Sequence, residues 1–316
     1  MLTPCQTKTL ESFKKFLRSE PGVFTIAGDA GSGKSTLIKE MEEYVQQHNL
    51  LMSSLDLPVI RDVIKTAPTN FAAAIIGGET VHRGFQIKYN KFGPDELKTA
   101  MFDSDNALYI VDECSMISRE MYDLILARAN QKKSHVVFMG DMNQLFPVKE
   151  TLSNSFRNHE LHNMTTVVRQ NTESALYKAI QQAKEAIYDD SIILQGNEDV
   201  ILVDDEVEFR ELLKKEFNDK PSNSQVLVYS NKRAEEYSRL TGNESYVYYQ
   251  GKPIGKHLAG YTKDYTSVPV TTIHKAQGRT YRKVFIDYRD IIKSKEHRRL
   301  FYVALSRASH KAVILI

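Results

Sequence analysis

The sequence predicts an α/β protein with two domains, each built on a parallel sheet, and with two small inserted subdomains. A chain of 316 residues with 41% hydrophobic content can bury the cores of two ordinary domains. Short apolar runs rich in β-branched and aromatic residues alternate with segments of helical periodicity, as in parallel sheets covered by helices. Two longer stretches interrupt this alternation.

The first half reads as a strand–helix repeat. Its apolar runs end at Gly, Pro or acidic residues, as buried parallel strands do. Strands are predicted at 23–28, 63–68, 107–113 and 135–141, and helices at 34–48, 69–76 and 118–130.

The second half repeats the pattern. Strands are predicted at 165–168, 225–230, 268–273, 283–288 and 312–316, and helices at about 172–188, 205–217, 231–240 and 296–308. The change of rhythm near Asn154 to Asn163 predicts domains at 1–158 and 159–316.

The two interruptions cover residues 84–106 and 241–267. Both exceed the usual connection of ~2–6 residues and mix aromatic residues with Lys. We expect each to form a small subdomain inserted into its parent domain.

Composition excludes several classes of protein. Only Cys5 and Cys114 are present, so no disulfide framework or paired-cysteine metal site is expected. No segment approaches the ~18 apolar residues of a membrane span, and the first residues do not read as a signal peptide, so we expect a cytoplasmic protein without membrane partners. Residues 271–316 carry eleven Lys or Arg against three Asp or Glu, which fits either a solvated basic face or a polyanion groove.

A phosphate-binding loop follows the first predicted strand. The segment GDAGSGKST fits G-x-x-x-x-G-K-[ST] and precedes a predicted helix, a context that disfavours a merely structural glycine turn. Its backbone N–H groups would surround phosphates, Lys34 would bridge the β- and γ-phosphates of ATP, and Ser35 would bind Mg²⁺. The predicted contacts with nucleotide are Gly28, Ala30, Gly31, Ser32, Gly33, Lys34, Ser35 and Thr36.

Two acids close the predicted strand LYIVDE. Asp112 is suited to hold Mg²⁺, and Glu113 to act as the general base that activates water. Paired acids at a strand end are common by chance, and it is the phosphate loop upstream that favours the catalytic interpretation.

Eight segments in order resemble the motifs of superfamily one helicases. They are GDAGSGKST, TAPTNFAA, TVH, VDECSM, GDMNQLFPV, VVRQ, TTIHKAQGRT and YVALSRAS. The HKAQG and GDMNQLFPV forms are most similar to the RecD-like branch that includes the phage Dda helicase. The resemblance runs through almost the whole chain and implies two RecA-like domains with ATP between them and single-stranded nucleic acid crossing both.

The resemblance also assigns catalytic and nucleotide-binding roles. Gln144 would sense the γ-phosphate and the attacking water, and Arg169 and Arg307 would be arginine fingers, which meet charge that develops in the transition state. Further contacts with the nucleotide are implied for Gln6, which would read adenine, and for Gln277 and Gly278.

Residues at strand ends match positions that contact the nucleic-acid backbone in the family. They are Pro68, Thr69, Asn70 and His82 in the first domain, and Thr272 and His274 in the second. Hydroxyl, amide and backbone groups position phosphates without reading bases, as a motor on any sequence needs. A histidine or threonine at a strand end more often caps a turn.

The insertion at 84–106 occupies the position of a duplex-splitting pin in the family. Phe85, Tyr89 and Phe92 are candidate surfaces for base stacking, or they pack the insertion onto its domain. The segment fits a β-hairpin, or a helix followed by a Gly-Pro turn. The insertion at 241–267 is much shorter than its counterpart in Dda-like enzymes.

We therefore expect a monomeric ATP-dependent helicase or translocase that uses ATP and Mg²⁺ and acts on single-stranded DNA and tailed duplex DNA. The resemblance implies 5′–3′ movement, with replication or recombination proteins as candidate partners. An RNA motor of the same superfamily is the main alternative. A metabolic phosphate-loop ATPase would have no use for the motifs of the second domain, and a binding module with a vestigial nucleotide site would not keep the catalytic residues intact.

Overall fold

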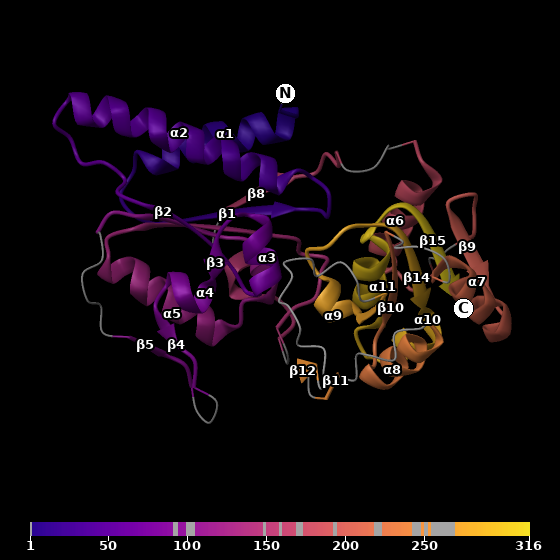
Figure 1. Ribbon diagram of the computed structural model, residues 1–316. Coiled ribbons are helices and arrows are strands. Elements are labelled where there is room, and N and C mark those ends of the chain that lie inside the picture. The colour runs from indigo at the N-terminus through magenta and orange to yellow at the C-terminus, as the bar shows by residue number, and fades with distance from the viewer. Residues whose placement is uncertain are drawn as a thin grey trace. The chain divides into compact units, whose positions relative to one another are not determined.

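The computed structural model forms two compact units, Met1–Arg169 and Gln170–Ile316, which are described in turn (Figure 1). The boundary between the two units lies about ten residues after the predicted one. The structure describes residues 2–90, 94–98, 105–147, 150–157, 160–168, 173–191, 195–217, 223–241 and 269–316, and the backbone of 248–249 and 252–253.

The first unit is built on a six-stranded parallel sheet of order β3-β2-β6-β7-β1-β8. The strands are β1 (Val23–Gly28), β2 (Val63–Ala67), β3 (Glu79–Thr80), β6 (Leu108–Val111), β7 (His135–Gly140) and β8 (Leu161–Met164). All four strands predicted in the first half are confirmed, and they occupy the centre of the sheet.

Helices cover both faces of this sheet, with α1 and α2 on one face and α4 and α5 on the other (Figure 1). They are α1 (Pro4–Leu17), α2 (Lys34–Ser54), α3 (Asn70–Ile75), α4 (Val81–Gly84) and α5 (Arg119–Gln131), with short 3₁₀ turns η1 (Cys114–Met116) and η2 (Asn154–Phe156). Two apolar clusters result. One packs Phe13, Leu37 and Met41 against the sheet, and the other packs Tyr122 and Ile125.

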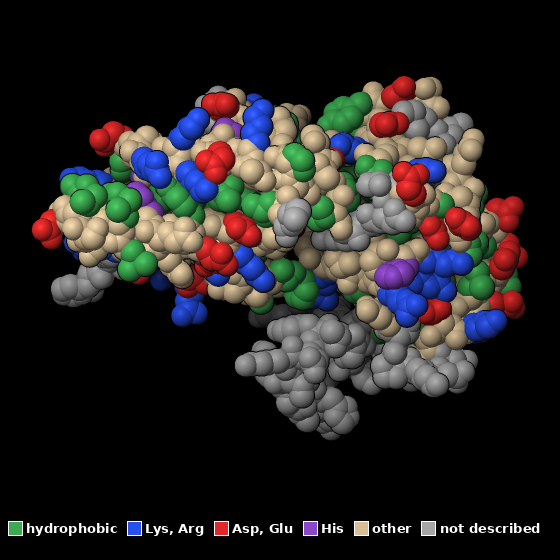
Figure 2. Space-filling model, turned by 90° about the horizontal axis from the view of Figure 1, so that it is seen from above, with side chains coloured by type: hydrophobic (Ala, Val, Ile, Leu, Met, Phe, Trp, Pro, Cys, Tyr) green, Lys and Arg blue, Asp and Glu red, His purple; other side chains and the backbone are tan. Residues whose placement is uncertain are grey.

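Helix α2 continues six residues beyond its predicted end at 48. Leu50 and Leu51 in this extension are 74% and 54% exposed, and Figure 2 shows hydrophobic side chains at the end of the unit where α2 stops. No residue of the extension is buried, so it shows no helical period of burial, although Leu and Met are strong helix formers. The Asn49 side chain holds this end of α2 by exchanging two hydrogen bonds with the backbone of Ile60.

The insertion after α4 contains an antiparallel pair of short strands, β4 (Ile87–Lys88) and β5 (Glu96–Leu97). Figure 1 shows this pair extending away from the sheet on the side of α4 and α5. Of the two predicted conformations, the β-hairpin is therefore the one found. Residues 91–93 lie outside the described ranges.

The second unit carries a five-stranded parallel sheet of order β13-β10-β14-β15-β9. Its strands are β9 (Val200–Val203), β10 (Ser224–Val228), β13 (Val270–Thr272), β14 (Tyr281–Asp287) and β15 (Ala308–Leu315). The predicted strand at 165–168 is wrong, because the paired strand is β8, which belongs to the first sheet. Strand β9 was not predicted, although its four apolar residues were a signal.

The four helices predicted in the second unit are confirmed, whereas two one-turn helices that directly follow β13 and β14 were not predicted. The helices are α6 (Ala175–Glu185), α7 (Glu206–Phe217), α8 (Asn231–Leu240), α9 (Ile273–Ala276), α10 (Tyr288–Ile291) and α11 (His297–Leu305), and β11 (Tyr248–Tyr249) pairs with β12 (Lys252–Pro253) in the second insertion. The two parallel sheets and two small insertions confirm the predicted fold class. None of the helices in the described ranges has both the length and the apolar character needed to cross a bilayer.

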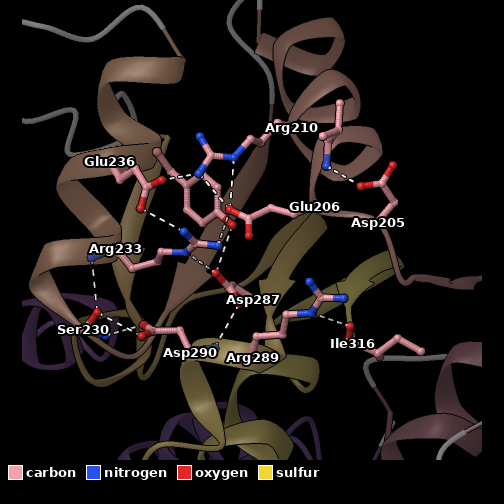
Figure 3. Close-up of polar contacts among 12 residues, drawn as sticks. Asp205, Glu206, Arg210, Ser230, Arg233, Glu236, Asp287, Arg289, Asp290 and Ile316 are labelled. Atoms are coloured by element: carbon pink, nitrogen blue, oxygen red, sulfur yellow. Dashed lines mark hydrogen bonds and ion pairs between the residues drawn. The ribbon is translucent and has the colours of Figure 1, made fainter.

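A network of charged side chains joins α7 and α8 to the end of β14 (Figure 3). The fully buried Asp287 carboxylate accepts hydrogen bonds from Arg233 Nε at 2.5 Å and from the Tyr237 hydroxyl at 2.9 Å. The other two nitrogens of the Arg233 guanidinium donate to Glu206 at 2.7 Å and to Glu236 at 2.8 Å. All three guanidinium nitrogens of Arg233 therefore have a carboxylate partner.

We expect Asp287→Asn to destabilise the second unit by about 3 kcal/mol, because the buried carboxylate accepts hydrogen bonds from Arg233 and Tyr237 that an uncharged amide cannot fully replace. Denaturant unfolding of the full chain measures this. Asp190→Asn is the matched control, since Asp190 is 86% exposed in its pair with Arg298, and should change stability by less than about 1 kcal/mol. Equal effects of the two substitutions would show that the Asp287 network contributes no more than a surface ion pair.

Candidate nucleotide-binding site

The phosphate loop lies between β1 and α2 and is shaped by its glycines. Gly31 and Gly33 each have φ of +82°, the left-handed region that glycine adopts without strain. A Cβ on Gly33 would lie 2.4 Å from Gln6 Nε2, so no larger residue fits there without displacing Gln6. Helix α2 begins at Lys34 without a side-chain cap, which leaves its first backbone N–H groups for an anion.

Two polar side chains of the loop face its own backbone. Lys34 Nζ donates to the carbonyl oxygens of Gly28 at 2.8 Å and Asp29 at 3.1 Å. The hydroxyl of Ser32 is buried and has no hydrogen-bond partner within the described ranges. A buried hydroxyl in this position is suited to donate to a ligand oxygen.

The predicted acid pair follows β6 and lies within electrostatic range of Lys34. Burial raises the pKa of Asp112 to about 6, with the charge of Glu113 adding to the shift and the Lys34 ammonium opposing it. Glu113 has φ of +52° and donates its backbone N–H to Asp112 Oδ1 at 2.9 Å. Its Oε2 is buried and makes no hydrogen bond to any described residue.

Asp141, directly after β7, connects the phosphate loop to the segment that follows this strand. Its fully buried carboxylate accepts from the backbone N–H of Ala30 at 2.9 Å and from Gln144 Nε2 at 3.2 Å. Its other oxygen accepts from the N–H of Asn143, whose side chain donates to Asp29 at 3.2 Å. Gln144 is thereby held beside the loop. Asp141 was not among the predicted site residues, although an acid directly after a buried strand is visible in GDMNQLFPV.

Gln6 lies against the phosphate loop as part of a helix cap. Its Oε1 accepts from the N–H of Thr3 at 2.8 Å in the capping box of α1, and its Nε2 donates to the carbonyls of Ser32 at 3.4 Å and Gly33 at 3.2 Å. The predicted contact with adenine stays a prediction.

In the second unit, Arg307 is 2% exposed and bonded within its own neighbourhood. It donates to the carbonyls of Val303 and Arg279 and to the Ser306 hydroxyl, at 3.1, 3.3 and 2.9 Å. Gln277 is buried, and neither atom of its amide has a hydrogen-bond partner within the described ranges. Gly278 adopts φ of +79°. Arg169 lies outside the described residues, so the finger roles stay predictions.

The predicted nucleic-acid contacts occupy strand ends and first turns. Pro68 and Thr69 follow β2, Thr69 caps α3 by accepting from the N–H of Ala72 at 3.2 Å, and Asn70 is exposed. In the second unit, Thr272 is the N-cap residue of α9 and is buried, whereas His274 in the first turn is exposed. These residues lie at carboxyl ends of parallel strands, the edge where ligands of such sheets bind.

The aromatic residues of the insertion divide into core and surface. Phe85 is fully buried and stacks on Tyr109 with ring centroids 4.3 Å apart, so its prediction as a base-stacking surface is wrong. An aromatic ring between a helix and a sheet gains more from burial than from exposure. Phe92 lies outside the described residues, and Tyr89 is 70% exposed. His82, expected to contact nucleic acid, bonds Asp95 of the hairpin at 2.7 Å.

The sequence model of a family described as AAA domain matches residues 2–201, and that of a UvrD-like helicase C-terminal domain matches residues 267–315. Among the curated proteins, none matches the sequence.

The solved structures with similar folds include two Pif1 helicases. One is from Bacteroides in complex with ADP-AlF3 and single-stranded DNA, at 18% identity and a TM-score of 0.63, with 99% of this chain and 92% of that chain covered. The other is from Candida albicans, at 15% identity and a TM-score of 0.53, with 100% and 95% covered. The family match spans both the phosphate loop and the acid pair. The chain therefore belongs to the AAA domain family over residues 2–201 and, with the UvrD-like helicase domain that follows, is a superfamily one helicase.

Proposed function

We propose that this helicase hydrolyses ATP to move along single-stranded DNA and to separate duplex DNA, in the 5′–3′ direction of the RecD-like branch. The observation that carries the proposal is the convergence of three features on the phosphate loop. The loop, the acid pair after β6, the Asp141 carboxylate after β7 and the Gln6 cap are joined by direct bonds or by electrostatic interaction with Lys34. Such a site is built to hold a triphosphate and respond to its hydrolysis.

The side chains of this site fit a nucleotide and a magnesium ion. Ser32 Oγ and Glu113 Oε2 are buried without a hydrogen-bond partner among the described residues, and the start of α2 has no side-chain cap, so donors and acceptors are available for a ligand. Loop N–H groups and Lys34 would hold the phosphates. Ser35 and Asp112 supply the hard oxygen ligands that Mg²⁺ prefers. The bound ion would neutralise charge on the phosphate oxygens.

The roles of the chain's own side chains in hydrolysis follow from these positions. Glu113 would take a proton from the attacking water through the oxygen that has no partner among the described residues. Asp141 would keep Gln144 beside the loop, where an amide can report the state of the γ-phosphate. Arg307 and Arg169 are proposed to add positive charge in the transition state.

The assignment of DNA as substrate rests on similarity of fold. The Bacteroides Pif1 structure contains single-stranded DNA, and another Pif1 structure at a TM-score of 0.61 concerns unwinding at forked DNA by two coordinating helicases. In this chain, the exposed Asn70 and His274 at strand ends are suited to touch a phosphate backbone. An RNA motor remains the second candidate.

One experiment tests substrate and direction together. ATPase activity of the full chain is measured with single-stranded DNA and with RNA of the same sequence, and unwinding is measured on duplexes with a 5′ or a 3′ tail. We expect stimulation by DNA and unwinding from the 5′ tail. Stimulation by RNA alone would overturn the DNA assignment, and no stimulation by either would overturn the motor.

We expect Lys34→Ala to reduce ATP turnover by about 10²-fold or more, because Lys34 meets phosphate charge, while oligonucleotide binding persists. Lys39→Ala is the matched control, since Lys39 is an exposed lysine of the same helix. Steady-state phosphate release and fluorescence anisotropy with a labelled oligonucleotide measure the two properties. Near-normal turnover in Lys34→Ala would contradict the assignment of the loop.

Glu113→Gln should reduce turnover by roughly 10²- to 10⁴-fold and leave ATP and Mg²⁺ binding intact, because the amide keeps the shape of the side chain and loses only the base. Binding of a fluorescent ATP analogue and single-turnover hydrolysis are the measurements. The exposed Glu120→Gln in α5 serves as control. If nucleotide binding falls as far as hydrolysis, Glu113 is a metal-binding or structural residue.

Replacing residues 89–94 with a short Gly/Ser link, which leaves the Asp95 partner of His82 in place, tests the hairpin as the strand-separating element. The replacement keeps β4, β5 and the buried Phe85. We expect DNA-stimulated ATPase to stay within about twofold while unwinding falls by about tenfold, since translocation needs only the strand-binding residues outside the hairpin. Equal losses of ATPase and unwinding would show that the segment belongs to the fold.

A further inference from the structure

A buried arginine of α5 holds the base of the hairpin. Arg128 is 1% exposed, and its guanidinium donates to three backbone carbonyls of the insertion. Nε donates to Phe85 O at 3.0 Å, and Nη2 donates to Lys98 O at 2.6 Å and to Gln86 O at 3.5 Å. Nη1 donates to the Gln131 side chain at 3.2 Å. The carbonyls of Phe85 and Gln86 directly precede β4, and that of Lys98 directly follows β5. One side chain therefore joins the start of the hairpin to its end.

The hairpin needs such support because its own pairing is small. In the described residues, β4 and β5 pair over two residues each, and the Lys98 N–H donates to Gln86 O at 2.9 Å beyond them. A two-stranded hairpin of this size is at best marginally stable in water. Gln86 also has φ of +53°, a backbone conformation that costs free energy for a residue with a side chain. External bonds to its carbonyl offset that cost.

Arginine is the one side chain that can make these bonds together. Its guanidinium offers five N–H donors in a fixed plane, whereas a lysine ammonium is a single point of charge. Burying a charged group is costly unless its donors are satisfied. The backbone carbonyls at the base of the hairpin therefore fix the position of the Arg128 guanidinium, and the guanidinium in turn fixes the positions of these carbonyls.

The helix that carries Arg128 also follows the acid pair of the nucleotide site. Glu113 leads into η1, Ser118 caps the start of α5, and Tyr122 and Ile125 of α5 pack in the same apolar cluster as Val111 of β6. The hairpin has a second attachment through the bond between Asp95 and His82 of α4. Its base is thus fixed to the element that continues from the catalytic carboxylates.

We propose that Arg128 is a positioning residue for strand separation. It holds the base of the hairpin in a fixed position on the first unit, so that the hairpin contacts duplex DNA at a fork. The proposal rests on the proposed helicase function. Arg128 acts through the carbonyls of Phe85, Gln86 and Lys98 and touches neither nucleotide nor nucleic acid. Loss of the planar guanidinium donors loosens the hairpin without changing the phosphate loop.

The test is Arg128→Lys in the full chain. This substitution keeps the positive charge and the helix propensity and removes the planar set of guanidinium donors. We expect unwinding of a 5′-tailed duplex to fall by about tenfold, since small misplacement of a working group has effects of this order. DNA-stimulated ATPase should stay within about twofold of the unmodified protein. Arg119→Lys, at an exposed arginine of the same helix, is the matched control and should leave both activities unchanged.

A second readout separates positioning from a general loss of structure. The unwinding defect of Arg128→Lys should be larger on a G·C-rich duplex than on an A·T-rich one, because a loosened hairpin bears less force against stronger pairing. Amide exchange at Lys98, whose N–H closes the hairpin, should accelerate, while exchange in β1 and β7 stays slow. The milder Gln131→Ala, at an exposed partner of Arg128, should lower unwinding by about twofold in the same pattern.

The outcomes distinguish this proposal from the proposed function. If Arg128→Lys unwinds DNA as fast as the unmodified protein, or loses ATPase and unwinding activity in equal proportion on both duplexes, the positioning role is overturned and the helicase function stands. An unmodified protein without DNA-stimulated ATPase would overturn the function itself. If Arg128→Lys does not fold, Gln131→Ala decides by the same criteria.

Discussion

The buried carboxylate of Asp141 is the interaction on which the nucleotide site depends. A phosphate loop is a run of backbone N–H groups that must point inward before any ligand arrives, and the N–H of Ala30 is held by Asp141 Oδ2 at 2.9 Å. The same carboxylate binds Gln144 and the N–H of Asn143. A charge with no exposure requires several donors to offset its desolvation. The need to satisfy one anion thus fixes two segments against each other.

This arrangement is possible because the sheet is parallel. The loop after β1, the acids after β6 and the segment after β7 come from three adjacent strands of one sheet, and parallel strands end at a common edge. The sequence predicted these strands because each is a buried, nearly continuous apolar run. It also predicted the loop and the acids, whose residue types are dictated by phosphate and metal chemistry. The central part of the candidate site was therefore accessible from sequence.

What the sequence could not predict depends on contacts between distant residues. Strand β8 has the half-polar sequence LHNM and lies at the edge of the sheet. The β-branched segment TTVV directly after it predicted a strand. This segment instead lies against the phosphate loop, where the Val168 N–H donates to Gly31 O at 2.8 Å. Phe85 reads equally well as core or surface until its stacking on Tyr109 is known. Arg128 reads as an ordinary charged residue of an amphipathic helix. Its role is defined by carbonyls thirty to forty-three residues away.

Within the described residues, Arg128 and Arg233 show that the role of a guanidinium depends on the groups to which it donates. Arg233 donates to carboxylates from three elements and so ties these elements together, which contributes to the stability of the second unit. Arg128 is bonded to carbonyls of a segment that pairs over only two residues per strand, so its donors determine where that segment lies. A stable domain would keep its shape without such a bond, whereas a marginal hairpin would not. The same chemical group therefore stabilises a fold in one unit and, in the other, orients an element whose use depends on its direction.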